Sequence, residues 1–117
     1  FNNQRIRVSK KNNIDDCLFA TGGKIEKELN IDYRKSGSAA LDMAYVASGR
    51  FDGYFQKNLN LWDIAAGIIL VKEAGGVVND IDLSIHHDIR IFCSNPNIKD
   101  SLSTKINVKL PVKLKSN

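Results

Sequence analysis

This sequence has few of the residues that cross-link or break a chain. It holds two cysteines and two prolines in 117 residues, and no apolar run approaches the roughly 20 residues of a bilayer-spanning helix. Cys17 and Cys93 lie far apart in apolar contexts, so they cannot form the close cysteine pairs typical of a zinc site. We therefore expect no membrane span. We also expect two buried free thiols in a reducing compartment, in preference to a disulfide.

An initial methionine and a signal-peptide pattern are also absent, because the sequence starts at Phe1 in a polar stretch. We therefore expect a fragment or a processed product. The length fits one ordinary domain. A hydrophobic content of 43% and a charged content of 26% are normal for a soluble globular protein, and we expect a cytoplasmic one.

The charge is moderately basic, with 17 basic and 13 acidic residues. Much of the excess lies near the two ends of the chain, at Arg5, Arg7, Lys10, Lys11, Lys105, Lys109, Lys113 and Lys115. The lysines near the end are not interleaved with aromatic residues, as they would be in a single-strand-binding surface. We therefore expect solvated chain ends and no specific nucleic-acid site. The sequence also lacks a phosphate-binding P-loop and a nucleophile elbow around a serine.

Periodicity predicts strands that alternate with helices. The expected strands cover 4–9, 17–20, 51–56, 77–78 and 90–94, and the expected helices cover 24–30, 38–48, 62–74 and 95–106. Such alternation indicates an α/β layer arrangement with some parallel pairing. The helix over 62–74 is apolar almost all round, so we expect it to be buried. Residues 108–117 are predicted to form an edge strand or a loose tail.

A carboxylate, Asp63, opens the helix of small residues over 62–74. The helix dipole alone favours an acidic residue there. A second interpretation is a ligand for a hard metal ion such as Mg²⁺, which takes oxygen ligands and usually one or two carboxylates. The polar stretch 56–60 before the helix is typical of a ligand-facing loop. The residues alone leave both interpretations open.

Gly37, Ser38 and Ala39 open another helix without bulky side chains. Free N–H groups at such a start can receive an anion or a hydroxyl, although a plain serine N-cap explains the same residues. Asp42, further along this helix, is expected to face solvent. The remaining polar candidates are weaker: the pair His86 and His87 beside Asp88 would point to opposite faces of a strand, and the aspartates Asp80 and Asp82 are typical of turns.

Three segments together carry a resemblance. The stretch GSAALDMAYVASGRFDGYFQ at 37–56 is followed by WDIAAG at 62–67 and EAGG at 73–76. They resemble the inositol monophosphatase family, and within it the bacterial SuhB-like (extragenic suppressor) branch. The resemblance runs from about residue 4 to about residue 106. It implies the C-terminal half of the layered α-β-α-β-α sugar-phosphatase fold, a mixed sheet flanked by helices. The implied division is a strand remnant of the N-terminal half at 1–14, a C-terminal α/β domain at 15–107 and a tail at 108–117.

The resemblance also implies an activity, namely magnesium-dependent hydrolysis of small phosphate monoesters such as myo-inositol 1-phosphate by metal-activated water. Asp63 matches a metal ligand of the family, and Gly37, Ser38 and Ala39 match its substrate-contacting turn. Where the family usually has a glutamate that binds sugar hydroxyls, this chain has Gln56. Glutamine both accepts and donates but carries no charge, so we expect an altered preference. Complete members are usually homodimers.

The family's G-E-x-x-E and D-P-x-D-G-T segments are absent from this sequence. They supply most metal ligands and the groups that activate water, so we expect no catalytic residue in this chain and no useful activity from it alone. A relative acting on nucleotide or sugar bisphosphates is disfavoured by residues 39–42, where such relatives commonly have a lysine. A further alternative is a non-catalytic remnant, or a partner-binding domain linked to transcription and RNA processing. The DNA upstream of the Phe1 codon would distinguish these alternatives.

Overall fold

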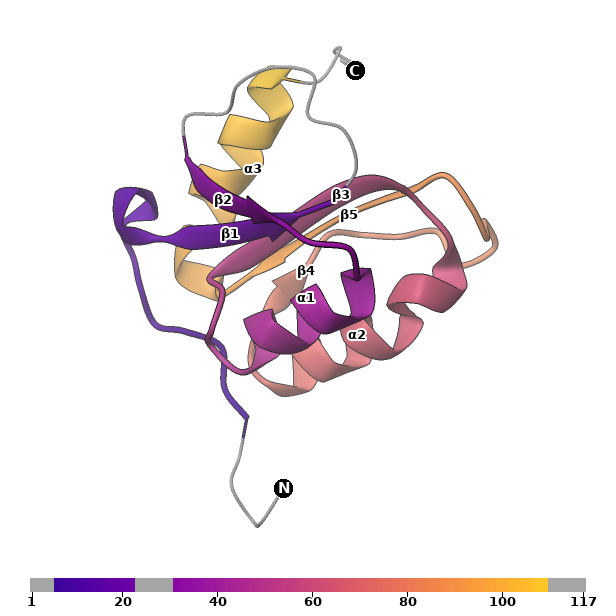
Figure 1. The fold of residues 1–117 in the computed structure, drawn as a ribbon, viewed down its shortest axis with the longest axis horizontal. Coiled ribbons are helices and arrows are strands. Elements are labelled where there is room, and N and C mark those ends of the chain that lie inside the picture. The colour runs from indigo at the N-terminus through magenta and orange to yellow at the C-terminus, as the bar shows by residue number, and fades with distance from the viewer. Residues whose placement is uncertain (1–5, 23–30, 110–117) are drawn as a thin grey trace.

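A five-stranded mixed sheet forms the centre of the fold in a computed structural model that describes residues 6–22 and 31–109 (Figure 1). The strand order is β2-β1-β3-β5-β4; β1 pairs in parallel with β2 and β3, and β5 is antiparallel to β3 and β4. The strands are β1 Leu18–Thr21, β2 Asp32–Lys35, β3 Gly53–Leu59, β4 Val77–Val78 and β5 Ile89–Ser94. The helices are α1 Ala39–Ala47, α2 Leu61–Glu73 and α3 Lys99–Lys109, with 3₁₀ turns at Ile14–Asp16 and Pro96–Ile98. The expected α/β alternation with some parallel pairing is confirmed.

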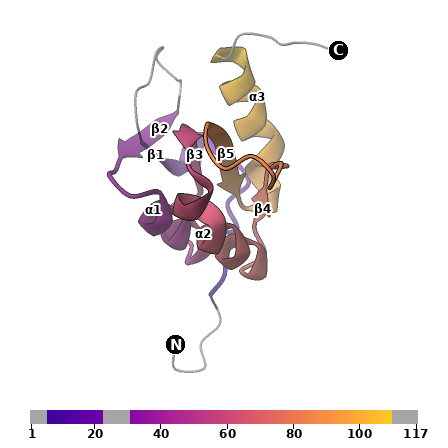
Figure 2. The ribbon, with the colours of Figure 1, turned by 90° about the vertical axis from the view of Figure 1, so that its right-hand side faces the viewer.

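Helices cover both faces of this sheet. α1 and α2 lie side by side on one face, and α3 lies on the other (Figures 1 and 2). Because side chains alternate along a strand, neighbouring residues enter different cores. Ala20 and Tyr54 pack in the core on the α1–α2 side, whereas Phe19 and Phe55 pack with Leu102 of α3. The sheet is therefore buried between two apolar layers, as the mixed sheet flanked by helices requires.

The ends of α1 and α2 follow local capping chemistry. Ser38 caps α1 by accepting a hydrogen bond from the Leu41 N–H at 3.1 Å, and Gly49 follows the helix with φ 82°. After α2, Gly75 takes φ 91°, and the Gly76 N–H reaches back to the Val71 carbonyl at 2.9 Å. This pattern is a Schellman motif, so the glycine pair predicted to close the helix does so.

The segment before β1 is extended but unpaired in the sheet. Residues 6–9 form no strand, so the strand expected over 4–9 is wrong for its described part. The Val8 N–H donates to the Ala74 carbonyl at 3.1 Å, and the buried Asn95 amide donates to Ser9 at 2.9 Å and to the Lys11 carbonyl at 3.1 Å. Lys11 also forms an ion pair with Asp52 at 3.1 Å. This segment is therefore held by side-chain and backbone contacts to other parts of the fold, and not by pairing with a neighbouring strand.

Asn95 and Pro96 begin the last helical region as expected. The Asn95 side chain accepts from the Ile98 N–H at 3.0 Å and caps the 3₁₀ turn that leads into α3. α3 continues to Lys109, which includes the first two residues of the predicted tail. The helix expected over 24–30 and the rest of the tail, 110–117, lie outside the described residues. The division into 1–14, 15–107 and 108–117 stays a prediction.

Three elements differ from expectation. β2 was not predicted, because Asp32–Lys35 is a polar stretch at the edge of the sheet. β3 runs on to Leu59, through the polar stretch 56–60 that is expected to form a loop. α2 is not buried all round. Ile64, Gly67 and Val71 face the core, whereas seven of the thirteen residues of the helix are exposed to solvent. A helix that is apolar on every side needs a second covering layer, and the described residues provide none.

Both cysteines are buried and free, as expected. Burial raises the pKa of the Cys17 thiol to about 11 and that of the Cys93 thiol to about 12. These thiols act as small apolar groups in the two cores. Within the described part of the chain, no helix combines the length and apolar character needed to cross a membrane.

Candidate functional site

The residues singled out from the sequence gather at one end of the sheet. α1 and α2 both begin at the end where β1 and β2 finish (Figure 1). The Ser36 N–H, just after β2, bonds to the Thr21 carbonyl at 3.0 Å and joins these two strand ends. In α/β sheets, ligands bind outside the carboxyl ends of parallel strands, where helix N-termini offer free N–H groups. This end of the molecule is therefore the candidate site.

The Gly37–Ala39 turn enters α1 with its polar groups largely engaged. The Ser38 hydroxyl accepts from the Leu41 N–H, and the Ser38 N–H donates to the Ser36 hydroxyl at 3.2 Å. Ser38 therefore acts as the N-cap of α1. The first N–H groups inside a helix have no partner within the helix, so the backbone at Ala39 is the part of this turn that can contact an anion. Contact of Gly37, Ser38 and Ala39 with substrate stays a prediction.

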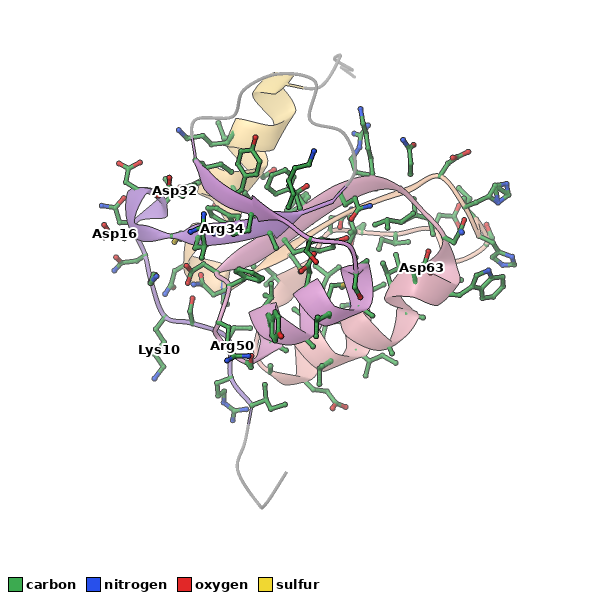
Figure 3. All side chains as sticks on the ribbon, viewed as in Figure 1. Lys10, Asp16, Asp32, Arg34, Arg50 and Asp63 are labelled. Carbon is green, nitrogen blue, oxygen red and sulfur yellow. The ribbon has the colours of Figure 1, made fainter. Side chains whose placement is uncertain are left out.

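Asp63 lies in the first turn of α2 and is exposed to solvent (Figure 3). The Asp63 N–H closes this turn on the Asn60 carbonyl at 3.0 Å, and Asn60 makes no side-chain cap. The carboxylate is thus free to point away from the helix start. Within 6–22 and 31–109, no group of three or more His, Cys, Asp or Glu residues could hold a metal ion. A role of Asp63 as a ligand for Mg²⁺ therefore stays a prediction, and the described residues do not form a metal site by themselves.

Gln56 lies in β3, as the strand expected over 51–56 requires, and β3 continues to Leu59, so the interpretation of the polar stretch 56–60 as a loop is wrong. β3 has one more residue than β5 between the pairs Gln56–Ile91 and Leu59–Ile89, and Asn58 takes φ 63°. This irregularity is a β-bulge, a feature common beside active sites. The strand therefore bends directly after Gln56 and leads into α2.

The Gln56 side chain is held on both sides. Its Oε1 accepts a hydrogen bond from the Tyr54 hydroxyl at 2.5 Å. On the other side the amide lies against Gly22, where a Cβ would come within 2.5 Å of Oε1. A residue larger than glycine at position 22 would therefore displace Gln56. Gly22 and Tyr54 position a candidate site residue, and neither was singled out from the sequence.

Asp42 is buried, with 1% of its surface exposed, so the expectation that it faces solvent is wrong. Burial raises the pKa of its carboxyl group, and a hydrogen bond with the Ser36 side chain lowers it. Its Oδ2 has no hydrogen-bond partner among the described residues. Asp42 is one helical turn beyond Ser38, and that spacing places the two residues on the same face of α1. This spacing was the signal that could have placed Asp42 beneath the candidate site.

Tyr54 is fully buried, and burial is the main cause that raises the pKa of its hydroxyl, with smaller contributions from Asp42 and Asp63. The phenol therefore keeps its proton at neutral pH and donates to Gln56. The spacing of Tyr54 and Gln56, two apart on a strand, indicates a shared face.

The start of α2 also carries an exposed aromatic residue. Trp62 is 72% exposed, and its ring lies 5.4 Å from the ring of His86. The Leu61 N–H donates to the His86 carbonyl at 2.8 Å and fixes this contact. His86 thus supports the helix start and belongs to no metal cluster among the described residues. Asp82 accepts from the N–H and hydroxyl of Ser84, which confirms its turn role.

Comparison with known proteins agrees with the fold and the motifs. Residues 1–110 match the model of the "Inositol monophosphatase family". An inositol-1-monophosphatase from Caulobacter vibrioides is 34% identical over 121 residues, covering 88% of this chain and 47% of that protein. The Nus factor SuhB of Escherichia coli K12 is 36% identical over 132 residues, covering 97% of this chain and 49% of that protein.

Solved structures give the same result. The extragenic suppressor protein SuhB from Bartonella henselae superimposes with a TM-score of 0.79 at 36% identity, covering 94% of this chain and 49% of that one. Inositol monophosphatase from Anabaena has the same TM-score at 32% identity, covering 95% of this chain and 51% of that one. The chain spans about half the length of the relatives it matches. The chain belongs to the inositol monophosphatase family.

Proposed function

We propose that this chain is the C-terminal part of a magnesium-dependent phosphatase that hydrolyses small phosphate monoesters such as myo-inositol 1-phosphate. The observation that carries the proposal is the convergence of Asp63, Gln56 and the Gly37–Ala39 turn at one end of the sheet. Family membership supports a phosphatase, and the names of two relatives contain inositol monophosphatase. The proposal concerns the complete protein, because the chain spans about half of those relatives.

Each of these residues has a distinct task in the proposal. The N–H groups at the start of α1 receive phosphate oxygens, since a helix N-terminus favours an anion. Gln56 binds an oxygen of the polyol. Asp63 supplies one oxygen ligand to Mg²⁺, which takes further ligands from carboxylates outside the described residues. When bound, the metal lowers the pKa of a coordinated water and stabilises negative charge on the phosphate.

The test compares the 117-residue chain with the protein made from the complete reading frame that contains it. We expect the chain alone to release no phosphate from myo-inositol 1-phosphate in the presence of Mg²⁺. In the complete protein, Asp63→Asn should lower kcat/KM by about 100-fold or more, since even changes around a metal ligand cost 10–100-fold. Asp82→Asn, which alters an exposed turn, is the matched control and should leave the rate unchanged.

Two results would contradict the proposal. Robust turnover by the 117-residue chain would show that one carboxylate is enough, and full activity of the Asp63→Asn protein would remove Asp63 from the site. Circular dichroism of each variant separates loss of activity from loss of fold. Metal dependence is read by adding and removing Mg²⁺ with a chelator, and activity should return when the ion is restored.

A second candidate is a partner-binding role linked to transcription. The Escherichia coli relative is named Nus factor SuhB. In this chain the exposed Trp62 contacts His86, and the segment just before His86 carries two further exposed apolar residues, Leu83 and Ile85. An upstream reading frame without G-E-x-x-E and D-P-x-D-G-T would favour this candidate, or a non-catalytic remnant. We also propose that the complete protein is a cytoplasmic homodimer, as the resemblance to the family implies.

A further inference from the structure

The orientation of the Gln56 amide carries a further inference. Oε1 of Gln56 accepts from the Tyr54 hydroxyl, and Tyr54 is a buried phenol that keeps its proton. The Gln56 amino group makes no hydrogen bond to any described residue, although the side chain is partly exposed. The amide thus turns its acceptor inward to Tyr54, and its two N–H donors have no partner within residues 6–22 and 31–109.

Packing limits the ways in which this amide can lie. Cδ, Oε1 and Nε2 of Gln56 all lie within 3.2 Å of the place where a Gly22 Cβ would stand, so the amide rests flat against the end of β1. Tyr54 lies in the core between the sheet and α1 and α2, and it is fully buried. The two groups that hold the amide are therefore themselves fixed by the sheet.

The chemistry of a glutamine differs from that of a glutamate in this position. A carboxylate only accepts hydrogen bonds, so it recognises a ligand group that has a proton to give. An amide whose oxygen is already engaged offers N–H donors, and it recognises a ligand oxygen that accepts. A hydroxyl can satisfy either residue, because it both donates and accepts. A ketone or carboxylate oxygen can satisfy only the amide.

We propose that Tyr54 fixes the Gln56 amino group toward the candidate site, so that this position selects a phosphorylated polyol or sugar with an acceptor oxygen, including a carbonyl. The inference rests on the proposed function for the location of the substrate. The orientation of the amide does not depend on it, and the two parts are tested separately.

The first experiment measures the amide by NMR spectroscopy in the protein from the complete reading frame. We expect Tyr54→Phe to shift the ¹³C resonance of the Gln56 side-chain carbonyl, because the hydrogen bond to Oε1 is lost. Exchange of the Gln56 amino protons with water should be fast in both proteins. Tyr45→Phe removes a hydroxyl from α1, away from Gln56, and is the matched control. Amino protons that are protected in the original protein and released by Tyr54→Phe would overturn the inference.

The second experiment measures kcat/KM in the protein from the complete reading frame. The probes are myo-inositol 1-phosphate and its analogues in which one ring hydroxyl at a time is oxidised to a ketone. We expect at least one ketone to be hydrolysed within about threefold of the parent. Gln56→Glu should lower the ratio of kcat/KM for this ketone to kcat/KM for the parent by about tenfold, because the carboxylate offers no donor to the ketone oxygen.

The outcomes of the second experiment separate the two proposals. Equal discrimination against every ketone by the original protein and by Gln56→Glu would overturn the inference and leave the phosphatase proposal intact. Failure of the original protein to hydrolyse any of the probes would count against the phosphatase proposal. In that case the NMR result still decides the orientation of the Gln56 amide.

Discussion

Asp42 is a buried carboxyl group in surroundings that favour its neutral form. One of its oxygens has no hydrogen-bond partner among the described residues, and burial raises its pKa. A buried carboxylate is costly unless it is paired. Asp52 shows the contrast, since it is equally buried but accepts from the Leu18 N–H at 2.7 Å and pairs with Lys11. The charged form of Asp42 is therefore penalised by burial, whereas a hydrogen bond and an ion pair offset the burial of Asp52.

The raised pKa of Asp42 predicts a pH-dependent stability. The native state holds this proton more tightly than the unfolded chain, whose aspartate pKa is about 3.9. Stability from this group is therefore greatest below about pH 4 and falls as the pH rises through the native pKa, by about 1.4 kcal/mol for each unit of elevation. Asp42→Asn removes the charge at similar size. We expect it to raise the free energy of unfolding at pH 7 relative to the original chain, and to raise it less at pH 4.

Urea unfolding at both pH values measures this difference. Asp52→Asn is the matched control, and it should destabilise the chain at pH 7 because it removes a buried carboxylate that accepts from the Leu18 N–H and pairs with the half-exposed Lys11. A greater loss of stability for Asp42→Asn at pH 7 than at pH 4 would contradict the prediction. It would show that the native state needs the charged form of Asp42.

Individual site residues were predictable from the sequence where a local motif defines them. Ser38, Gln56 and Asp63 were identified from helix starts and from the family resemblance, and the structure brings them to one end of the sheet. Gly22 was missed, because its contact with Gln56 depends on the pairing of β1 with β3, whereas Tyr54 could have been identified by its spacing of two residues from Gln56 on one strand. No short-range pattern encodes that pairing.

At the level of elements, close packing of α1 against α2 sets the geometry of the site. A Cβ at Gly67 of α2 would come within 2.7 Å of the Met43 sulfur and 2.9 Å of the Met43 Cβ. The Met43 Cβ is near the backbone and cannot move alone, so the helices would have to separate. The close approach of α1 and α2 at this point therefore depends on the absence of a side chain at position 67.

We predict that Gly67→Ala destabilises the chain despite the better helix propensity of alanine. Overpacking costs about 1–3 kcal/mol, whereas the propensity gain is about 1 kcal/mol, so a net loss of about 1 kcal/mol is expected. In the Met43→Ala background the loss should shrink, with a coupling of about 0.5 kcal/mol or more. Thermal unfolding of the four proteins measures the cycle.

The control for helix propensity is Ala65→Gly, at an exposed position of the same helix. It should cost about 1 kcal/mol without any coupling to Met43. If Gly67→Ala instead raised the melting temperature, helix propensity would dominate and the close contact between α1 and α2 would not limit position 67.

Element types were predictable from periodicity to different degrees. Ser38, Gly49 and Gly75 make the ends of α1 and α2 predictable from the sequence. The expected bounds of both helices lie within a residue or two of the observed ones. β2 was missed because an edge strand carries polar residues on both faces. The strand expected over 4–9 is wrong for its described part, because alternation of polar and apolar residues indicates one buried face and not pairing with another strand. The hydrogen bonds of this segment go instead to Ala74 and Asn95.

On the scale of the whole molecule, an apolar surface remains uncovered on the α1–α2 side. Leu41 of α1 is 47% exposed, and Trp62 and Ile69 of α2 are 72% and 59% exposed. The relatives are about twice as long as this chain, and the family's layered fold places a second half in contact with the first. Large exposed apolar surfaces favour association.

We therefore predict that the isolated 117-residue chain self-associates through the α1–α2 surface. Sedimentation velocity should show oligomers whose proportion rises with concentration. Ile69→Lys should shift the distribution toward monomer, because the charge cannot be buried between copies. Thr104→Lys, at an exposed position of α3 on the opposite face of the sheet, is the matched control and should have little effect (Figure 2). A clean monomer with cooperative melting would instead mean that this half folds as an independent unit, whose α1–α2 surface is tolerated in water.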